Sequence, residues 1–515
     1  MKKIQLLATF LFFSCLLSAQ PGTLDGDFDG DGIVFTDFGG NGDGASAIKV
    51  QPDGRIVAAG ASTDGTYADF ALARYFPDGS PDNSFDTDGK VTTDFNGYDD
   101  RIRDAALQPD GKIVVAGHTS DLTSNNFALA RYLTDGTLDN TFSFDGKVTT
   151  AFSGVSDGAQ AVIIQPDGKI IAAGLTNNGT DFDFAMVRYN ADGTLDNSFS
   201  SDGKLTTDVN GNYEQLGGAA IQPDGKIILG GRTGDGIDDD FLVVRYNTDG
   251  TIDNSFSSDG MVTSSFSSGI DAVNSLALDA AGKITAIGFA NIGAYGTFAV
   301  ARYHSDGTPD ASFDGDGQVF TDVALYVDLA SAGLLQPDGK ILAAGGADET
   351  GSGLAFALVR YNADGSLDQS FGTGGITITY AGTGTSYIND VALQADGKIL
   401  AAGSGFATTV DFTIARYFSG LNIGLEESVV PVGNLVVHPN PAFDVITLEY
   451  SGQRVEEMEL VISDLPGKQV YKESFNDISV PFRREIDLHD FASGTYFIML
   501  RTPMLHINRS LVIAR

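Results

Sequence analysis

Short apolar stretches separated by polar turns follow one another along most of the chain. Between residues 146 and 189, apolar and β-branched residues fill 146–150, 159–165, 169–174 and 184–189, with Gly, Asp and Asn between them. No helical period of 3.6 residues runs through these stretches, so they predict strands. The Asp-Gly turns suit tight connections, because Asp accepts local backbone N–H bonds and Gly tolerates positive φ. The pattern therefore predicts a four-stranded antiparallel meander with apolar residues on both faces.

This unit recurs at a fixed spacing. Pro-Asp-Gly-Lys and its near copies return every 57 residues five times running and then after 58. One such unit cannot bury its apolar surface without neighbours, so a fixed period predicts a solenoid, a propeller or an array. We interpret residues 20–418 as an all-β, seven-bladed β-propeller; an open β-solenoid is the alternative, but its turns are usually shorter than this period. The glycines of the seven copies are Gly54, Gly111, Gly168, Gly225, Gly282, Gly339 and Gly397.

The order of strands within the repeats predicts how the ring closes. The chain starts its first unit with an extra strand at 33–38, equivalent to 90–95, and its last unit stops after 412–417 without a copy of that strand. We expect 33–38 to complete the last blade beside 412–417, which would remove an exposed sheet edge.

Several motifs recur in register over about residues 24–418. They are Gln-Pro-Asp-Gly-Lys-Ile, Phe-Ala-Leu-Ala-Arg-Tyr and Asp-Gly-Thr-Leu-Asp-Asn-Ser-Phe, and the fifth copy departs from the first of them with Asp279-Ala280-Ala281-Gly282-Lys283. Through these motifs the chain resembles the delta-60 repeat family of exported bacterial β-propellers. The resemblance implies the fold and no particular activity.

The first 19 residues have the pattern of a secretory signal peptide. Lys2 and Lys3 precede an apolar run at 4–17, and Ser18-Ala19-Gln20 offers a cleavage site after Ala19. The only cysteine, Cys15, lies in this segment, so we expect a mature chain without a disulfide or a Cys-ligated metal; lipidation of Cys15 is a weaker alternative. No other segment reaches the length of a membrane helix.

The periodicity ends after Tyr417. Residues 419–434 read as a linker, and alternating apolar residues in 435–515 predict a small Ig-like β-sandwich. Three motifs mark this part: His438-Pro439-Asn440-Pro441, the stretch 461–468 and the stretch 494–500. They resemble the type A sorting domain of the type IX secretion system of Bacteroidota. The resemblance implies transport by that machinery across the outer membrane to the cell surface or the medium.

Charge and missing motifs narrow the function classes. The chain has 31 basic and 68 acidic residues and a net charge of −37, which would repel nucleic acid and anionic membranes. It contains no His-Glu-x-x-His, nucleophile elbow, phosphate loop or dinucleotide fingerprint, and its five histidines recur at no repeat position. We expect a non-catalytic binding or adhesion scaffold for protein or polysaccharide. A carboxylate-based polysaccharide hydrolase or lyase and a purely structural surface protein are the alternatives.

Calcium is the one cofactor that the sequence suggests. Asp25, Asp27, Asp29 and Asp31 alternate before glycine as at the start of a calcium loop. The twelfth position is Thr36, however, where a bidentate Glu would be expected, and the stretch is also the first copy of the recurring Leu-Asp-Asn-Ser-Phe segment. A structural turn is therefore the favoured interpretation.

One arginine recurs in every unit, which raises the question of a ring-shaped anion site. We favour a structural ion pair in each blade with the aspartate of Leu-Asp-Asn-Ser-Phe, such as Arg131 with Asp139 or Arg188 with Asp196, because an arginine in an apolar strand needs a carboxylate partner. The seven arginines are Arg74, Arg131, Arg188, Arg245, Arg302, Arg360 and Arg416.

Binding is better sought where the copies differ. Alternate turns of a meander share a face, so the uniform Asp-Gly turns should lie on one side and the variable loops on the other. Aromatic residues beside acidic ones on these loops suit the capture of a glycan or a protein. The candidate binding residues are Tyr67, Tyr98, Asp99, Asp100, Arg101, Tyr213, Asp238, Asp239, Tyr295 and Tyr326.

Overall fold

The computed structural model describes most of the chain as two separate units, residues 1–421 and 422–515. Residues 1–19 and most of the predicted linker lie outside the described residues, so the signal peptide stays a prediction. The part that the structure describes contains no helix with the length and hydropathy of a membrane span. The described residues are 20–39, 42–152, 155–293, 295–421, 434–438, 442–451, 455–464, 469–478, 482–489, 491–501 and 506–513.

The first unit consists of seven four-stranded antiparallel sheets. The first strands of the sheets are β2 (Gly42–Val50), β6 (Asp100–Leu107), β10 (Asp157–Ile164), β14 (Tyr213–Ile221), β18 (Asp271–Leu278), β22 (Asp328–Leu335) and β26 (Tyr387–Leu393). The second strands are β3 (Ile56–Thr63), β7 (Ile113–Ser120), β11 (Ile170–Asn177), β15 (Ile227–Gly234), β19 (Ile284–Ile292), β23 (Ile341–Ala347) and β27 (Ile399–Phe406).

The remaining two strands of each sheet follow in the same order. The third strands are β4 (Ala68–Tyr75), β8 (Asn125–Tyr132), β12 (Phe182–Tyr189), β16 (Asp239–Tyr246), β20 (Tyr295–Tyr303), β24 (Ala355–Tyr361) and β28 (Val410–Tyr417). The outer strands are β5 (Lys90–Thr93), β9 (Lys147–Thr150), β13 (Lys204–Thr207), β17 (Met261–Ser264), β21 (Gln318–Thr321), β25 (Ile376–Thr379) and, for the last sheet, β1 (Ile33–Thr36).

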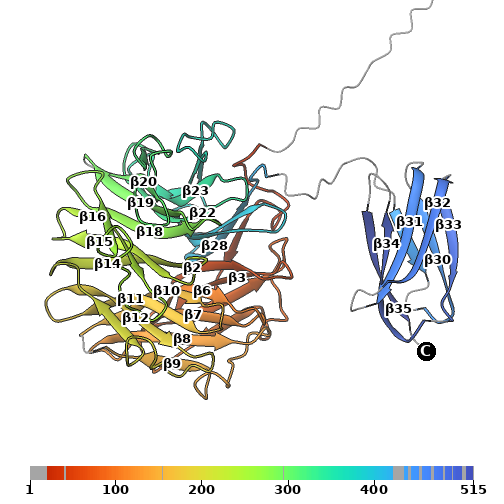
Figure 1. The fold of residues 1–515 in the computed structure, drawn as a ribbon, viewed down its shortest axis with the longest axis horizontal. Helices are drawn as coiled ribbons and strands as arrows, with labels where there is room; N and C mark the ends of the chain where they lie inside the picture. Colours follow the sequence, from red (N-terminus) through yellow and green to blue (C-terminus); the bar gives the residue numbers. More distant parts are fainter. Residues whose placement is uncertain are drawn as a thin grey trace, which may run out of the picture. The chain divides into compact units, whose positions relative to one another are not determined.

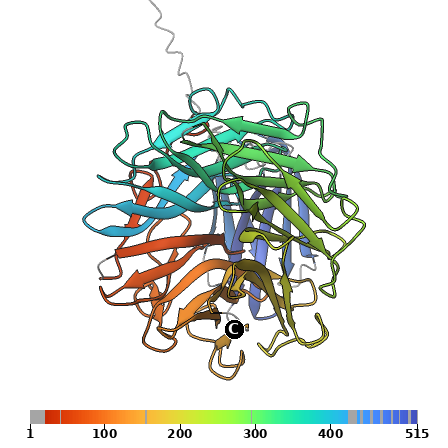
Figure 2. The same cartoon turned by 90° about the vertical axis from the view of Figure 1, so that its left-hand side faces the viewer.

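The seven sheets are arranged in chain order around a central axis and form a β-propeller (Figures 1 and 2). Apolar residues on facing sheets fill the space between blades: Val57 and Leu72 of the first blade pack with Ile113 and Val115 of the second. Each fully buried Val, Leu or Ile contributes roughly 1.5–3 kcal/mol relative to an exposed one. Blade stacking therefore supplies the core that a single meander lacks.

The predicted ring closure is confirmed. Strand β1 pairs antiparallel with β28, with Ile33 opposite Ala415 and Thr36 opposite Phe412. The sheet order β1-β28-β27-β26 therefore joins the first strand of the propeller to its last three. Figure 2 shows the red and light-blue ends of the propeller as neighbours.

The antiparallel order gives the propeller two different faces. We call the face with the Asp-Gly turns, such as 51–55 and 76–80, the constant face. The loops between second and third strands and those that follow the outer strands form the opposite face, which we call the variable face. Its described loops are 37–39, 64–67, 94–99, 121–124, 151–152, 155–156, 178–181, 208–212, 235–238, 265–270, 322–327, 348–354, 380–386 and 407–409.

The second unit contains two sheets that share one core. Strands β29 (Asn434–His438), β30 (Val445–Ser451) and β33 (Phe482–Asp487) form one sheet, and β32 (Gln469–Ile478), β31 (Val455–Asp464), β34 (Gly494–Arg501) and β35 (His506–Ile513) form the other. Leu448 and Ile486 of the first sheet pack in one cluster with Leu460 and Ile498 of the second. This arrangement is a small β-sandwich, while its Ig-like classification stays a prediction.

Candidate functional site

The recurring arginines lie on the constant face in ion pairs. The predicted pairs are present: Nε of Arg131 lies 2.8 Å from Oδ2 of Asp139, and Nε of Arg188 lies 2.7 Å from Oδ2 of Asp196. Each guanidinium also stacks on the phenylalanine of the same motif, as Arg131 does on Phe142 at 4.7 Å. The equivalent pairs are Arg74 with Asp82, Arg245 with Asp253, Arg302 with Asp310, Arg360 with Asp368 and Arg416 with Asp25.

These arginines also join neighbouring blades. Nη1 of Arg131 donates to the carbonyl oxygen of Ala191 in the next blade, and Nη1 of Arg416 donates to that of Pro77 across the ring closure. Nε, Nη1 and Nη2 of Arg131 all have hydrogen-bond partners inside the protein, which leaves little for an external anion. This geometry supports a structural role.

The calcium candidate at residues 25–31 belongs to the same set of contacts. Asp25 is buried, and its Oδ2 lies 2.7 Å from Nη2 of Arg416 and 3.0 Å from Nζ of Lys398. Asp31 accepts a hydrogen bond from the backbone of Ile33. Among the described residues, no group close enough to share a cation includes Asp25, Asp27, Asp29 or Asp31. These contacts support the structural turn favoured from the sequence, in which Asp25 is already paired with Arg416 and Lys398.

Aromatic pairs lie on the variable face, as the loop pattern suggested. The rings of Tyr67 and Tyr98 meet edge to face at 5.4 Å, and those of Tyr295 and Tyr326 at 5.8 Å. Tyr213 packs on Phe182 at 5.9 Å. Each pair joins the start of a third strand to the segment that leads into the next blade, and Tyr213 and Tyr295 are already the first residues of β14 and β20. Asp238 is exposed on its loop, and Asp99 accepts a hydrogen bond from the backbone of Ala68.

Two candidate binding residues lie in strands with their carboxylates buried, which corrects their placement on solvated loops. Asp100 begins β6, is 0% exposed and accepts a hydrogen bond from the backbone of Phe95 at 2.7 Å. Asp239 begins β16, is 0% exposed and pairs with Arg232 at 3.3 Å. At these positions the chain has already re-entered the sheet, so the carboxylate satisfies a backbone or guanidinium donor of the protein.

The first strands of all seven blades line a cavity of about 590 Å³ at the axis. Each first strand has a bulge, and the extra residue of the bulge lines this cavity. The bulge residues are Ser46, Arg103, Gln160, Gly217, Asn274, Ser331 and Asn389. A bulge re-aims its side chain and often occurs next to a site. The axis therefore carries a ring of mostly polar residues that differ from blade to blade.

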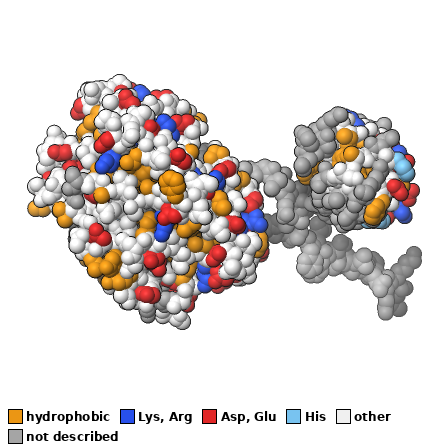
Figure 3. Space-filling view, turned by 90° about the horizontal axis from the view of Figure 1, so that it is seen from below, with side chains coloured by type: hydrophobic (Ala, Val, Ile, Leu, Met, Phe, Trp, Pro, Cys, Tyr) orange, Lys and Arg blue, Asp and Glu red, His pale blue; other side chains and the backbone are white. Residues whose placement is uncertain are grey.

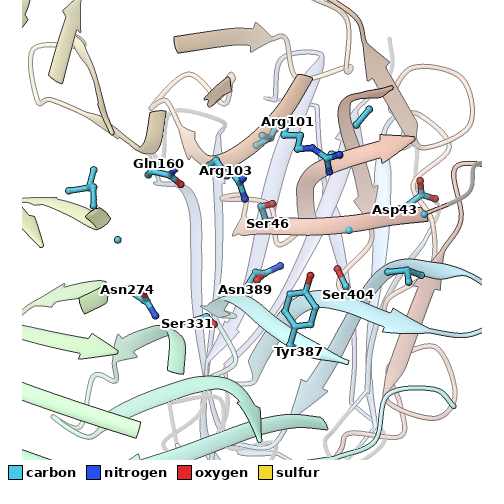
Figure 4. A pocket seen from close by; sticks show the side chains of 18 of the residues that line it. Asp43, Ser46, Arg101, Arg103, Gln160, Asn274, Ser331, Tyr387, Asn389 and Ser404 are labelled. Atoms are coloured by element: carbon cyan, nitrogen blue, oxygen red, sulfur yellow. The ribbon is translucent and has the colours of Figure 1, made fainter. Parts of the chain in front are cut away.

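Two arginines of β6 make one side of this cavity cationic. Figure 4 shows Arg103, Ser46, Asn389 and Tyr387 around the same space, with Arg101 beside them. Arg101 is half-exposed and lies 3.7 Å from Oδ1 of Asp99. Within the described residues, Arg103 has no carboxylate at ion-pair distance. Burial lowers the pKa of Arg103, and the neighbouring charge of Arg101 lowers it further.

The pKa of His118, in β7, responds to the positive charge of these two arginines. Burial and then the charges of Arg103 and Arg101 lower its pKa to about 4. The imidazole is therefore neutral at pH 7 and adds no charge of its own.

Lys49 lies on the same first strand as Ser46 and is neutralised. Nζ of Lys49 lies 2.7 Å from Oδ2 of Asp390 and 3.4 Å from Oδ1 of Asp104, on the two flanking blades. Burial opposes the charged amine, but the two carboxylates outweigh it and raise the pKa of Lys49. Among the described residues, the unpaired positive charge of the cavity therefore belongs to Arg103, while Arg101 has Asp99 at ion-pair distance.

Sequence reasoning found Arg101 but missed the rest of the cavity. The signal was a polar residue inside an otherwise apolar stretch, such as Gln160 between Ala159 and Ala161, at a repeat position that changes in most copies. On the face of the propeller that Figure 3 shows, acidic and basic side chains are scattered without a continuous patch of either sign.

The fold and the recurring contacts define a seven-bladed β-propeller protein with a C-terminal β-sandwich. The chain carries seven segments of the family described as "Domain of unknown function (DUF5122) beta-propeller", and its residues 436–514 form a "Secretion system C-terminal sorting domain". Both resemblances drawn from the sequence motifs are thereby confirmed. The sorting domain is that of the type IX secretion system and indicates export to the cell surface or the extracellular space. The propeller segments are 51–85, 108–142, 165–199, 222–256, 282–313, 336–371 and 394–422.

Solved structures with similar folds are distant. Drosophila Plexin A in complex with Semaphorin 1b is 11% identical with a TM-score of 0.40, over 77% of this chain and 87% of that chain. Polysaccharide lyase Uly1 is 12% identical with a TM-score of 0.41, over 74% and 90%. At this level of similarity neither structure bears on function. No curated protein matches the chain.

Proposed function

We propose that this exported propeller is a non-catalytic binding scaffold whose ligand is a polysaccharide that carries acidic groups. The observation that carries the proposal is the axial cavity of about 590 Å³ with two arginines on one side, in a chain whose net charge is −37. A free guanidinium offers a planar donor fork that matches a carboxylate or a sulfate.

The rest of the lining suits sugar hydroxyl groups. The side-chain amides of Gln160 and Gln215 make no hydrogen bond among the described residues, and the hydroxyl of Ser331 faces the same cavity. Tyr387 is 39% exposed and offers a ring face to a sugar. Rigid polar groups from different strands around a concave site are typical of ligand pockets. A protein ligand would instead be expected to use the exposed aromatic residues of the variable-face loops.

A binding assay with a matched ligand pair tests the proposal. The full chain is titrated with a panel of uronate-containing polysaccharides and with the same polymers after reduction of their carboxyl groups. We expect saturable binding to an acidic polymer and loss of binding on reduction. Arg103→Gln should weaken binding about tenfold or more, because a hydrogen bond to a charged group is worth about 1.5–3 kcal/mol.

Arg483→Gln, in the second unit, is the matched control for the loss of one charge and should leave binding unchanged. Equal binding to acidic and reduced polymers would show that the arginines do not recognise the acidic groups of the ligand. Release of shortened chains from any polymer of the panel would contradict a non-catalytic role and would show that the protein is an enzyme.

A further inference from the structure

Three groups of acidic residues recur at one place on the variable face. In each group the three side chains offer one oxygen apiece, and these oxygens all lie within 4.8 Å of one another. The groups, which we call the carboxylate triads, are Asp37 with Asp43 and Asp411, Asp69 with Asp94 and Asp100, and Asp183 with Asp208 and Glu214.

The members of a triad come from equivalent strands each time. Asp69 is the second residue of the third strand β4, Asp94 directly follows the outer strand β5, and Asp100 begins β6 of the next blade. The other two triads repeat this arrangement between the third and fourth blades and between the last blade and the first. Each triad therefore spans the boundary between two blades.

Each triad contains a buried oxygen that the protein leaves without a partner. Asp43, Asp100 and Asp183 are 3%, 0% and 7% exposed, and Oδ1 of each makes no hydrogen bond. The other oxygen of Asp43 accepts from the backbone of Phe38 at 2.8 Å, and that of Asp100 from Phe95 at 2.7 Å. A buried unpaired carboxylate oxygen is costly, so each one requires an explanation.

The charge of the triads is also unbalanced. None of the nine carboxylates forms an ion pair with a basic residue in the described part of the chain, whereas each aspartate opposite a recurring arginine, such as Asp139, does. The three carboxylates of a triad, each with an oxygen within 4.8 Å of the others, repel one another. A positive ion between the three side chains would remove this repulsion.

We propose that each carboxylate triad binds one Ca²⁺ ion that joins two neighbouring blades. A separation of up to 4.8 Å between ligand oxygens fits a central ion at about 2.4 Å from each, which is the Ca²⁺–oxygen distance. The ligands are hard oxygens without His or Cys, which disfavours transition metals. Mg²⁺ demands a smaller and more regular octahedron. Extracellular calcium modules commonly bind at 10⁻⁴–10⁻³ M by order of magnitude, which suits an exported protein.

The other blade boundaries provide internal comparisons. Between the second and third blades, the equivalent positions are Asn126, Ala151 and Asp157. There Oδ1 of Asp157 accepts a hydrogen bond from Thr176 at 2.6 Å, so no oxygen of Asp157 is left unpaired. This boundary is complete without an ion. The buried aspartate at this repeat position is therefore satisfied within the protein where the second and third carboxylates are absent.

Calorimetric titration of the chelator-treated full chain with Ca²⁺ tests the proposal, and we expect three ions per chain and a raised melting temperature. Asp69→Asn should reduce the number to two. The side chain of Asp69 makes no hydrogen bond among the described residues, so this change removes a ligand charge without removing a hydrogen bond of the fold. Asp240→Asn is the matched control, because Asp240 occupies the same repeat position beside Ser265, and it should leave three ions.

A variant with an additional calcium site tests the same geometry, and in this variant no carboxylate ligand is removed. Asn126→Asp combined with Ala151→Asp builds a triad with Asp157 and should raise the number of bound ions from three to four. No heat and no thermal shift with Ca²⁺ would overturn the proposal. Equal losses in Asp69→Asn and Asp240→Asn would also overturn it, because they would assign the binding to the general acidity of the surface.

Discussion

Arg131 and Asp139 are paired at 2.8 Å within one blade, and the same guanidinium donates to the carbonyl oxygen of Ala191 in the next blade. The side chain of Asp139 is almost fully buried and also accepts hydrogen bonds from the backbone and the hydroxyl of Thr141. The most regular motif of the chain thus fixes both the conformation of a blade and its contact with the next one.

Asp139→Asn should destabilise the propeller by about 3–5 kcal/mol, because it leaves the buried guanidinium without its counter-charge. Denaturant unfolding of the full chain measures this change. Asp86→Asn is the control, since Asp86 is exposed and forms no ion pair among the described residues; it should change stability by less than about 0.5 kcal/mol. Equal stability of the two variants would mean that the pair contributes nothing.

The same pair predicts a pH dependence. Burial raises the pKa of Asp139, but the hydrogen bonds from Thr141 and the cations Lys112 and Arg131 outweigh it and lower the pKa to about 2. The folded pKa is below the unfolded value of about 3.9, so the stabilisation is present above pH 4 and is lost as the pH falls through 2. The stability difference between wild type and Asp139→Asn should therefore shrink between pH 4 and pH 2. A constant stability difference between the two proteins over this pH range would contradict a lowered pKa of Asp139.

Closure of the ring by β1 predicts a strong effect of a short deletion. Removal of residues 24–38 takes away the outer strand of the last blade, the buried Phe28 and the partner of Arg416. The melting temperature should fall sharply, because the edge of β28 and its apolar side chains become exposed. Replacement of residues 349–352, on an exposed loop, by two glycines is the control. An equal melting temperature for the two variants would show that the ring does not depend on β1.

The repeated elements were predictable from sequence because every copy adds evidence for the same strand and the same turn. Arg188 and Asp196 are an example: their constant separation and opposite charge indicate one contact per blade. The predicted placement of Asp100 was wrong because a lone aspartate at the end of a loop reads as solvated. Its recurrence as Asp43, Asp157 and Asp271 at the same spacing was the available signal of a structural role.

The axial cavity could not be predicted from the alternation of apolar and polar residues. A bulge inserts one residue into a strand, so the side chains on either side of Gln160 or Asn274 no longer follow a period of two. Which residue then points to the axis depends on backbone register, and register appears only when the paired strand is known. The sequence therefore predicts the strands of the propeller more readily than the residues that line its axial cavity.

The C-terminal sorting domain predicts a change of location on its removal. A chain without residues 435–515 should accumulate in the periplasm, because the machinery that carries the propeller outward recognises that domain. Cell fractionation with detection of the propeller measures this outcome. A chain with Lys472→Gln, on the surface of the same domain, is the control and should reach its usual location. Surface display of the truncated chain would refute the dependence on the sorting domain.

The position of His118 beside two arginines allows the charge of the axial cavity to be measured directly. Arg103→Gln removes a positive charge that disfavours the imidazolium, so the pKa of His118 should rise from about 4 towards its ordinary value near 6.5. Binding of an acidic polysaccharide at the arginines should shift it in the same direction. NMR titration of histidine-labelled protein resolves this group among the five histidines of the chain. Arg483→Gln is the control and should leave the pKa of His118 unchanged. If Arg103→Gln also left this pKa unchanged, the charge of Arg103 would not act on His118.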